Sequence, residues 1–349
     1  MSDSSVVTAA SVLVVTVSYK TAGLVERSLR ALAAERARDP EIDVRAFVVD
    51  NASGDYEPLR AAVEREGWQD WVTLYAAPRN GGFSYGNNLG FKHAFEQARP
   101  PDFFMMLNPD AEVRPGCLTA LVRFLRANPH VAVAGSQLVA EDGTPWPYAF
   151  RFLSIFSEVD KAVSWGPLTR LLDRWGTTRR MGPHPERVDW LPGAAMMVRS
   201  SVVERVGGLD ERYFLYFEEL DFFLKLHRAG LETWYVPDSH VFHVTGASTG
   251  VTAPGSRAAL PDYWFESRRR FYAKNHGVPY AMLTDVATVG AYLLGELKRT
   301  VQSNRGSARP AFLRGLLRNT VLRAGNREVP AALEFRPTQR PDSALGRRG

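Results

Sequence analysis

The stretch Val12-Leu-Val-Val-Thr-Val-Ser18 decides the fold class of this chain of 349 residues. It is a short run of apolar, mostly β-branched side chains, which is typical of a strand buried on both faces. Residues 22–35 follow it and repeat apolar side chains at helical spacing, from Leu24 to Leu32. A buried strand followed by an amphipathic helix predicts the start of a β-α-β unit.

The same alternation continues as far as residue 127. Further strands are expected at 44–49, 71–76 and 103–107, and further helices at 57–66, 85–97 and 117–127. Strands that alternate with helices of this length predict an α/β fold with a mainly parallel central sheet and flanking helices. Ligands of such sheets bind beyond the carboxyl ends of the strands. We therefore expect functional side chains in the segments that directly follow the strands.

The composition narrows the class of protein. It is 45% hydrophobic and 23% charged, which is ordinary for a soluble enzyme with a sizeable core. The single cysteine, Cys117, excludes a disulfide framework and a cysteine-based zinc site, and we expect a buried structural thiol there. The polar N-terminus lacks the layout of a signal peptide, so we expect a cytoplasmic protein.

The positive charge is concentrated at the C-terminal end. Residues 298–349 hold 12 Lys or Arg against 3 Asp or Glu, a net charge of +9, which leaves −4 on the first 297 residues. No recognition helix, zinc finger or ribonucleoprotein motif occurs, so we expect no nucleic-acid partner. An anionic membrane surface is the better partner for this segment, and a solvated tail without a partner is the alternative.

Two motifs follow the early strands. Asp50 comes directly after a strand, where its carboxylate can accept a hydrogen bond from a nucleobase or a ribose hydroxyl; an Asx turn or a helix cap is the alternative. The run Asn80-Gly-Gly-Phe-Ser-Tyr-Gly-Asn-Asn-Leu-Gly90 lets the backbone approach a ligand and opens a helix whose N-terminus favours phosphate. Its glycines have neither dinucleotide-binding nor P-loop spacing.

Two acidic motifs follow later. Asn108-Pro-Asp110 ends an apolar run and presents oxygen ligands of the kind that Mg²⁺ or Mn²⁺ prefers, with a plain turn as the alternative. The cluster Tyr213-Phe-Leu-Tyr-Phe-Glu-Glu-Leu-Asp221 places three carboxylates among aromatic side chains, with an acidic helix start as the alternative. A late histidine, His243, ends a further apolar stretch. Two carboxylate sites and a histidine suggest metal-assisted group transfer.

The order and content of these motifs resemble glycosyltransferase family 2, inverting enzymes of the GT-A fold, and especially its rhamnosyltransferase-like branch. The resemblance covers residues 12 to about 250, some two-thirds of the chain. The segments that carry it are Val14–Tyr19, Val48–Ser53, Asn80–Phe83, Gly86–Gly90, Leu107–Ala111, Pro192–Ala195, Phe214–Asp221 and His243–Ser248.

The resemblance implies a site for a nucleotide-sugar donor, dTDP- or UDP-linked, in the first half of the chain. The residues implied for donor binding are Thr16, Ser18, Asp50, Asn51, Asn80, Gly81, Gly82, Asn87 and Asn108. Asn108 replaces the first acid of the family's Asp-x-Asp pattern, so Asp110 becomes the main ligand of the expected Mn²⁺ or Mg²⁺. His243 resembles the late histidine that completes the family's metal site.

The acidic cluster would supply the general base, which takes the proton from the acceptor hydroxyl as that oxygen attacks the anomeric carbon. Glu219 occupies the position of the family's base, with Glu218 and Asp221 as alternatives. Helical spacing predicts that Glu218 and Asp221 share one side of a helix, and like charges this close should raise at least one pKa. The residues expected at the acceptor are Trp190, Gly193 and Tyr216.

The expected organisation is a GT-A domain at 1–250, with a donor-binding half at 10–115 and an acceptor and catalytic half at 116–250. A helical extension is expected at 251–330 and a basic, disordered tail at 331–349. Residues 278–297 are largely apolar, but Asp285, Glu296 and Pro279 argue against a membrane span. An interfacial helix on a membrane and a helix that forms a homodimer are alternatives for this segment.

The expected function is an inverting, metal-dependent transfer of L-rhamnose from dTDP-rhamnose to a saccharide or polyprenyl-linked acceptor. The product would enter cell-surface polysaccharide or glycolipid, assembled at the inner face of the cell membrane. A UDP-sugar transferase of the same fold is the nearest alternative. A nucleotidyltransferase should show a glycine-rich basic loop, of which residues 18–24 hold only a faint version. A non-catalytic nucleotide-sugar-binding module should lack Asp110, Glu219 or His243, and all three are present.

Overall fold

A nine-stranded sheet forms the centre of the computed structural model, which describes residues 9–140, 142–146, 149–243, 260–301, 310–319, 331 and 333–337. The strand order is β3-β2-β1-β4-β10-β6-β11-β5, and β9 pairs with β11. The strands are β1 Ala10–Ser18, β2 Ile42–Asp50, β3 Val72–Ala76, β4 Phe103–Leu107, β5 Ala111–Val113, β6 Val131–Val139, β9 Glu186–Val188, β10 Ala195–Arg199 and β11 Glu232–His243. Two short strands, β7 Ala149–Phe150 and β8 Thr178–Arg179, form a second sheet.

The first half of the sheet follows the predicted pattern. Strands β3, β2, β1 and β4 are all parallel, with helices between them. The second half is mixed, because β10 runs antiparallel to both β4 and β6 while β11 is parallel to β6. The sheet is therefore less parallel than the alternation predicted. The alternation of strands and helices does not continue there. The connection from β6 to β10 is long and contains the small β7–β8 sheet, where a parallel pair would have a single crossover helix.

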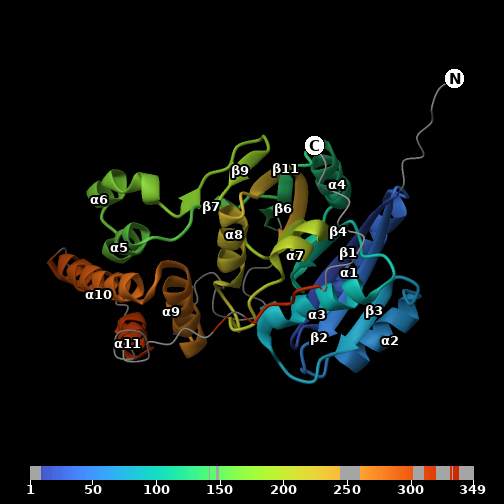
Figure 1. The fold of residues 1–349 in the computed structure, drawn as a ribbon, viewed down its shortest axis with the longest axis horizontal. Helices are drawn as coiled ribbons and strands as arrows, with labels where there is room; N and C mark the ends of the chain where they lie inside the picture. Colours follow the sequence, from blue (N-terminus) through green and yellow to red (C-terminus); the bar gives the residue numbers. More distant parts are fainter. Residues whose placement is uncertain are drawn as a thin grey trace.

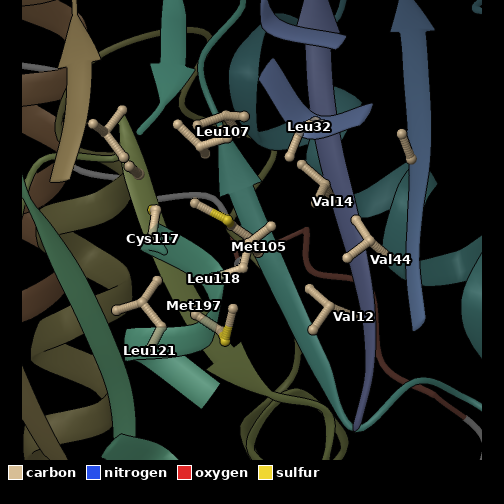
Figure 2. Packing of buried hydrophobic residues seen from close by; sticks show 14 of the residues in the cluster. Val12, Val14, Leu32, Val44, Met105, Leu107, Cys117, Leu118, Leu121 and Met197 are labelled. Carbon is tan, nitrogen blue, oxygen red and sulfur yellow. The ribbon is translucent and has the colours of Figure 1, made fainter. Parts of the chain in front are cut away.

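Helices cover both faces of the sheet (Figure 1). One core cluster joins β1, β4 and β10 to the helices α1 and α4, and Figure 2 shows Val12, Met105 and Leu118 within it. The other joins the opposite face of the sheet to α3, α7 and α8. Cys117 lies in the first cluster, where burial raises the pKa of its thiol to about 11, so the predicted structural thiol is confirmed. The helices are α1 Ala22–Arg38, α2 Tyr56–Glu66, α3 Gly82–Glu96, α4 Cys117–Ala127, α7 Ser200–Val206 and α8 Glu218–Arg228.

A helical end lies beside this domain, on the left of Figure 1. It is formed by α5 Ile155–Val163, α6 Gly166–Leu171, a 3₁₀ turn at Asp173–Trp175, α9 Asp262–His276, α10 Val278–Val301 and α11 Pro310–Asn319. Helix α10 packs against α5, α9 and α11. Among the described helices, none is both long and apolar enough to cross a membrane.

A short part of the expected disordered tail is instead packed against the domain. The backbone N–H of Leu333 donates to Asp210, and Glu334 forms an ion pair with Lys225 at 3.2 Å. The ring of Phe335 packs 5.9 Å from that of Phe95. The prediction of disorder is wrong for residues 333–337. It was based on the basic residues of the tail, whereas the contacts are made by Leu333, Glu334 and Phe335. Residues 338–349 lie outside the described part of the chain.

Candidate active site

A cleft of about 490 Å³ opens where β1, β2 and β4 end. Residues from the start of α3, the loop before α8, the end of β11 and the start of α9 also line the cleft. The lining residues are Val17, Tyr19, Asn51, Asn80, Gly82, Phe83, Asn108, Pro109, Asp110, Phe214, Leu215, Tyr216, Glu218, Glu219, His243 and Tyr263. A larger, open groove of about 810 Å³ lies between α1, α4 and β11, but it contains none of the predicted site residues.

Two asparagines organise the side of the cleft near β2. The amide Nδ2 of Asn51 donates to Asn80 Oδ1 at 2.9 Å and to the carbonyl of Gly82 at 3.2 Å. In return, the backbone N–H of Gly81 donates to Asn51 Oδ1 at 3.2 Å. These bonds tie the end of β2 to the turn that starts α3. Asn51, Asn80 and Gly82 therefore lie together at the cleft, as the sequence predicted.

The glycines of this turn allow close contact with neighbouring parts of the protein. Gly82 has φ +83°, and a Cβ atom placed on it would lie 1.8 Å from the carbonyl oxygen of Phe214. The same carbonyl accepts a hydrogen bond from Phe83 N–H at 3.1 Å. A Cβ on Gly86 would lie 2.5 Å from a methyl group of Val17. The glycine pattern thus holds α3 close to β1 and to the loop before α8.

Asp110 and His243 meet through strand pairing. Strand β5 begins directly after Asp110 and pairs antiparallel with the end of β11, where Ala111 lies opposite His243. His243 Nε2 comes within 3.3 Å of Asp110 Oδ1, although the geometry is not that of a hydrogen bond. Residues separated by more than 130 positions are therefore brought to one point, as the sequence predicted.

The Asp110–His243 pair fits a hard divalent cation. Asp110 is 5% exposed, and its Oδ1 is buried without a hydrogen-bond partner. In the part of the chain that the structure describes, no group of three or more His, Cys, Asp or Glu gathers into a complete metal site. Two protein ligands suit Mg²⁺ or Mn²⁺, because these cations commonly take their remaining ligands from water and from substrate phosphates.

The two glutamates at the start of α8 reach the same cleft. Glu218 is 1% exposed, and its Oε2 has no hydrogen-bond partner. Glu219 is half-buried, and its Oε1 accepts a hydrogen bond from the backbone N–H of Gly193 at 3.2 Å. A Cβ on Gly193 would lie 2.6 Å from that oxygen, so only glycine allows the contact. Gly193 therefore positions Glu219, which is a different task from the acceptor binding that was expected of it.

Burial and charge separate the two carboxyls. Burial, followed by repulsion from Glu219, raises the pKa of Glu218 well above the usual glutamate range. Burial also raises the pKa of Glu219, but the N–H of Gly193 stabilises its charged form and opposes this rise. The charged form is therefore disfavoured more strongly at Glu218 than at Glu219. This difference suits Glu219 as the general base of the pair.

Two left-handed residues precede this helix. Tyr216 and Phe217 both have φ +68°, which is rare for residues other than glycine. Such backbone conformations cluster at functional sites. Here they lead the chain into the first turn of α8. Tyr216, which was expected at the acceptor, lines the cleft.

Asp221 lies outside the cleft, contrary to its expected place among the candidate bases. Its carboxylate accepts hydrogen bonds from Lys274 at 2.7 Å, Asn275 at 2.6 Å and Tyr213 at 3.1 Å. It is 2% exposed and ties α8 to α9. Glu218 and Asp221 both lie in the first turn of α8, as the helical spacing predicts. They have different neighbours because α9 packs against Asp221 and not against Glu218.

Three residues predicted at the donor lie behind the cleft wall at the ends of β1 and β2. Asp50 accepts hydrogen bonds from Ser53 at 2.6 Å and from Tyr56 N–H at 3.1 Å. Burial alone would raise the pKa of Asp50, but these bonds outweigh it and lower the pKa. The Asx-turn alternative describes it correctly. Ser18 donates to Asp55, and Thr16 is buried within the sheet.

Two further predicted residues hold the fold instead of lining the cleft. Asn87 Nδ2 donates to the carbonyl of Phe83 at 3.0 Å within α3. Trp190, expected at the acceptor, stacks on Phe150 with ring centroids 4.5 Å apart, and its Nε1 donates to the Arg151 carbonyl. An indole with a satisfied N–H against a core face is ordinary packing.

The sequence interpretation missed several aromatic lining residues. Tyr19 follows β1 and is 39% exposed, and Phe214 lies across the cleft at 37%. Tyr263 comes from the first turn of α9 and stacks on Tyr216, with ring centroids 6.1 Å apart. Their only signal in the sequence is an aromatic residue next to a strand end or a turn. Tyr263 could not be placed because the contact joins the helical extension to the domain.

The sequence matches one protein family and several characterised relatives. The model of the family "Glycosyl transferase family 2" matches residues 13–201. The N-acetylglucosaminyl-diphospho-decaprenol L-rhamnosyltransferase of Mycobacterium tuberculosis is 31% identical over 249 residues, which cover 68% of this chain and 77% of the relative. The rhamnosyltransferase WbbL of Escherichia coli K12 is 27% identical over 164 residues, covering 46% and 60%.

A solved structure is similar in fold across most of the chain. A mannosyltransferase from Pyrobaculum calidifontis, solved with GDP-Man and Mn²⁺, superposes with a TM-score of 0.50 at 17% identity. The match covers 88% of this chain and 78% of the other. The GT-A fold expected from the sequence is confirmed.

Proposed function

This chain belongs to glycosyl transferase family 2 and is a glycosyltransferase of the GT-A fold, and we propose that it moves L-rhamnose from dTDP-rhamnose to a saccharide on a polyprenyl diphosphate. The sugar is supported by two relatives whose names specify rhamnosyl transfer. The lipid-linked acceptor is supported by the diphospho-decaprenol in the name of one of them.

The observation that carries the proposal is the meeting of three separate segments at one cleft. Asp110 and His243 lie together on one wall, and Glu219 lies on another. The asparagine-tied turn of Asn51, Asn80 and Gly82 completes the donor side. These residues support the proposal because together they could hold a diphosphate and a divalent cation beside a carboxylate base in a single cavity.

The chemistry starts from the carboxylate of Glu219 at the cleft. Glu219, ionised, takes the proton from the acceptor hydroxyl, and the freed oxygen attacks the anomeric carbon of the sugar. A new C–O bond forms as the bond from that carbon to the nucleoside diphosphate breaks. One displacement inverts the anomeric centre and needs no covalent intermediate. The raised pKa of Glu218 disfavours a second negative charge beside the base.

The leaving diphosphate needs compensation of its charge. Asp110 and His243 would hold the divalent cation, and Asn108 on the same turn would contact the ribose or a cation-bound water. When bound, the cation supplies positive charge that stabilises the departing diphosphate. Tyr19 and Tyr216 offer apolar ring faces to the base and to the sugars.

A transfer assay with the full chain tests the proposal. The acceptor is decaprenyl diphosphate carrying N-acetylglucosamine, and dTDP-rhamnose, UDP-glucose, UDP-N-acetylglucosamine and GDP-mannose are offered separately with Mn²⁺. We expect one deoxyhexose to be added from dTDP-rhamnose only, as measured by mass spectrometry of the lipid.

Two other results would replace the proposal. Transfer from a UDP-sugar alone would establish the UDP-dependent alternative of the same family. Binding of dTDP-rhamnose by calorimetry, without transfer to any saccharide acceptor, would indicate a non-catalytic module. Omitting Mn²⁺ and adding a chelator tests the metal dependence in the same assay.

A further inference from the structure

Helix α10 is inverted in its distribution of polar and apolar side chains. Between Val278 and Lys298, every exposed side chain is apolar. The large ones are Met282, Leu283, Val286, Leu293, Leu294 and Leu297, which are 46–63% exposed. Thr284, Asp285 and Thr288 are buried on the other side of the helix. A helix of a water-soluble surface normally shows the opposite arrangement.

The polar side of α10 is fixed by a buried ion-pair network. Arg268 of α9 is fully buried and donates to Asp285, to Thr288 at 3.2 Å and to Glu158 of α5 at 3.2 Å. These bonds set the rotation of α10 about its axis. The leucines face outward because the helix cannot turn them inward without breaking the ion pair between Arg268 and Asp285.

The apolar side is one continuous surface. At 100° per residue, the exposed positions fall within an arc of about 120° and span about 27 Å along the axis. Gly290 lies within this arc, and no atom lies within 4 Å of where its Cβ would be. An apolar surface of this extent on a well-packed helix marks an interaction site.

The elements that pack against α10 add exposed aromatic and basic side chains. Phe156 and Trp165 are 45% and 48% exposed, and Lys298 donates to the carbonyl of Ser164, next to Trp165. On α5 and α11, which pack against α10, the exposed basic residues are Lys161, Arg314 and Arg318. Helix α6 and the 3₁₀ turn, which follow α5 in the chain, add Arg170 and Arg174. Among the described residues of α5, α6, the 3₁₀ turn, α10 and α11, Asp173 is the one exposed acid, and α9 adds Asp262 and Glu266.

We propose that this surface, formed by the outward face of α10 with its aromatic and basic neighbours, docks on an anionic lipid bilayer without crossing it. Leucine and tryptophan side chains enter the interfacial region, and the arginines contact lipid phosphates. Residues 302–330 carry 6 Lys or Arg and 1 Glu, which extends the positive charge beyond α10. A second copy of the chain fits less well, because pairing two such surfaces would bring their basic rims together.

Vesicle flotation with the full chain, without donor or acceptor, tests the docking. We expect binding to phosphatidylcholine vesicles that contain phosphatidylglycerol and little binding to phosphatidylcholine alone. The double variant Leu293→Glu, Leu297→Glu should lower the partition coefficient by about tenfold or more, because both side chains lose apolar burial and add repulsive charge. Arg170→Glu should lower it by about fivefold or more. The matched control is Leu333→Glu, an equally exposed leucine on the packed tail, which should bind as the wild type does.

Circular dichroism checks that each variant is folded. Equal binding by the wild type and the folded double variant would overturn the proposal, as would equal binding to both kinds of vesicle. A dimer in sedimentation velocity that forms without lipid and disappears in the double variant would assign the surface to a second copy instead. Because no sugar is transferred in this measurement, its failure leaves the proposed transfer reaction untouched, and a failed transfer assay leaves the docking untouched.

Discussion

Adjacent carboxyls at Glu218 and Glu219 lead to a prediction at the scale of single residues. Glu219→Gln should reduce kcat by about 10²–10⁴-fold, because the general base is lost, while donor binding remains. Glu218→Gln should keep most of the activity, because a glutamine imitates the protonated acid that the structure favours there. Steady-state kinetics and donor calorimetry on both variants measure the difference. Equal losses in the two variants would contradict the assignment of the base.

The pH dependence has a definite sign for each residue. Glu219 must be ionised to act, and its pKa is raised, so kcat/KM should fall with decreasing pH at a value above the usual glutamate pKa of about 4.3. For stability, the raised pKa of Glu218 means that the unfolded chain ionises first as the pH rises. Ionisation of Glu218 therefore destabilises the folded state at pH values above the pKa that Glu218 has in the unfolded chain, and this effect disappears below that pKa. Glu218→Gln should therefore raise Tm at pH 8 and not at pH 4, as measured by calorimetry.

Asp110 and His243 allow a binding test that does not depend on turnover. Asp110→Asn should abolish the Mn²⁺-dependent part of dTDP affinity, because the buried, unpartnered Oδ1 loses its charge. His243→Ala should weaken the same component. Asp238→Asn and His240→Ala are matched controls, since both residues are exposed on β11. Calorimetric titration of dTDP with and without Mn²⁺ measures the effect, and wild-type metal dependence in Asp110→Asn would contradict the cation site.

At the scale of elements, the turn into α3 carries the next prediction. Gly82→Ala should weaken donor binding and lower stability, because the new Cβ would force the Phe214 carbonyl away from the cleft. Gly54→Ala is the matched control: Gly54 has φ +88° but open space around it, so it should cost only about 1 kcal/mol of backbone strain. Donor affinity and urea unfolding separate the two effects. Similar donor affinity in both variants would show that the contact with Phe214 is not needed.

The same elements show how far the sequence could lead. The bounds of β4 and α4 agree with the prediction to the residue, because their side-chain periodicity and the local turns point to the same structure. Asp110 was predicted at a strand end, Glu219 in an acidic cluster and His243 at the end of an apolar stretch, and all three line the cleft. Asp50, Ser18 and Asp221 do not line the cleft and bond to neighbouring residues instead. The sequence could not show this, because a buried carboxylate or hydroxyl that bonds to its neighbours has the same sequence signal as one that faces a ligand. Tyr263 was missed because its place depends on how α9 packs.

On the scale of the whole molecule, two buried aspartates join the extension to the domain. Asp210 accepts from Arg270 at 2.6 Å and from Lys274 at 3.0 Å, and Lys274 also donates to Asp221. Helix α9 is thereby held against α8, and its first turn places Tyr263 in the cleft. The alternation of strands and helices contains no information about this junction, since it depends on charges that are far apart in the chain. The cleft is thus completed by the extension.

Residues 333–337 close the same junction, which makes their removal informative. Leu333 N–H donates to Asp210, Gly208 N–H donates to the Phe335 carbonyl at 2.7 Å, and Glu334 pairs with both Lys225 and Lys274. Ending the chain after residue 330 should lower the free energy of unfolding by about 2–4 kcal/mol, because it removes a packed ring and leaves buried polar groups without partners. Ending it after residue 337 keeps every one of these contacts and serves as the control. Urea unfolding measures both truncations. If the two are equally stable, the packed tail contributes nothing to the fold, and the hold on α9 must come from Asp210 and Asp221 alone.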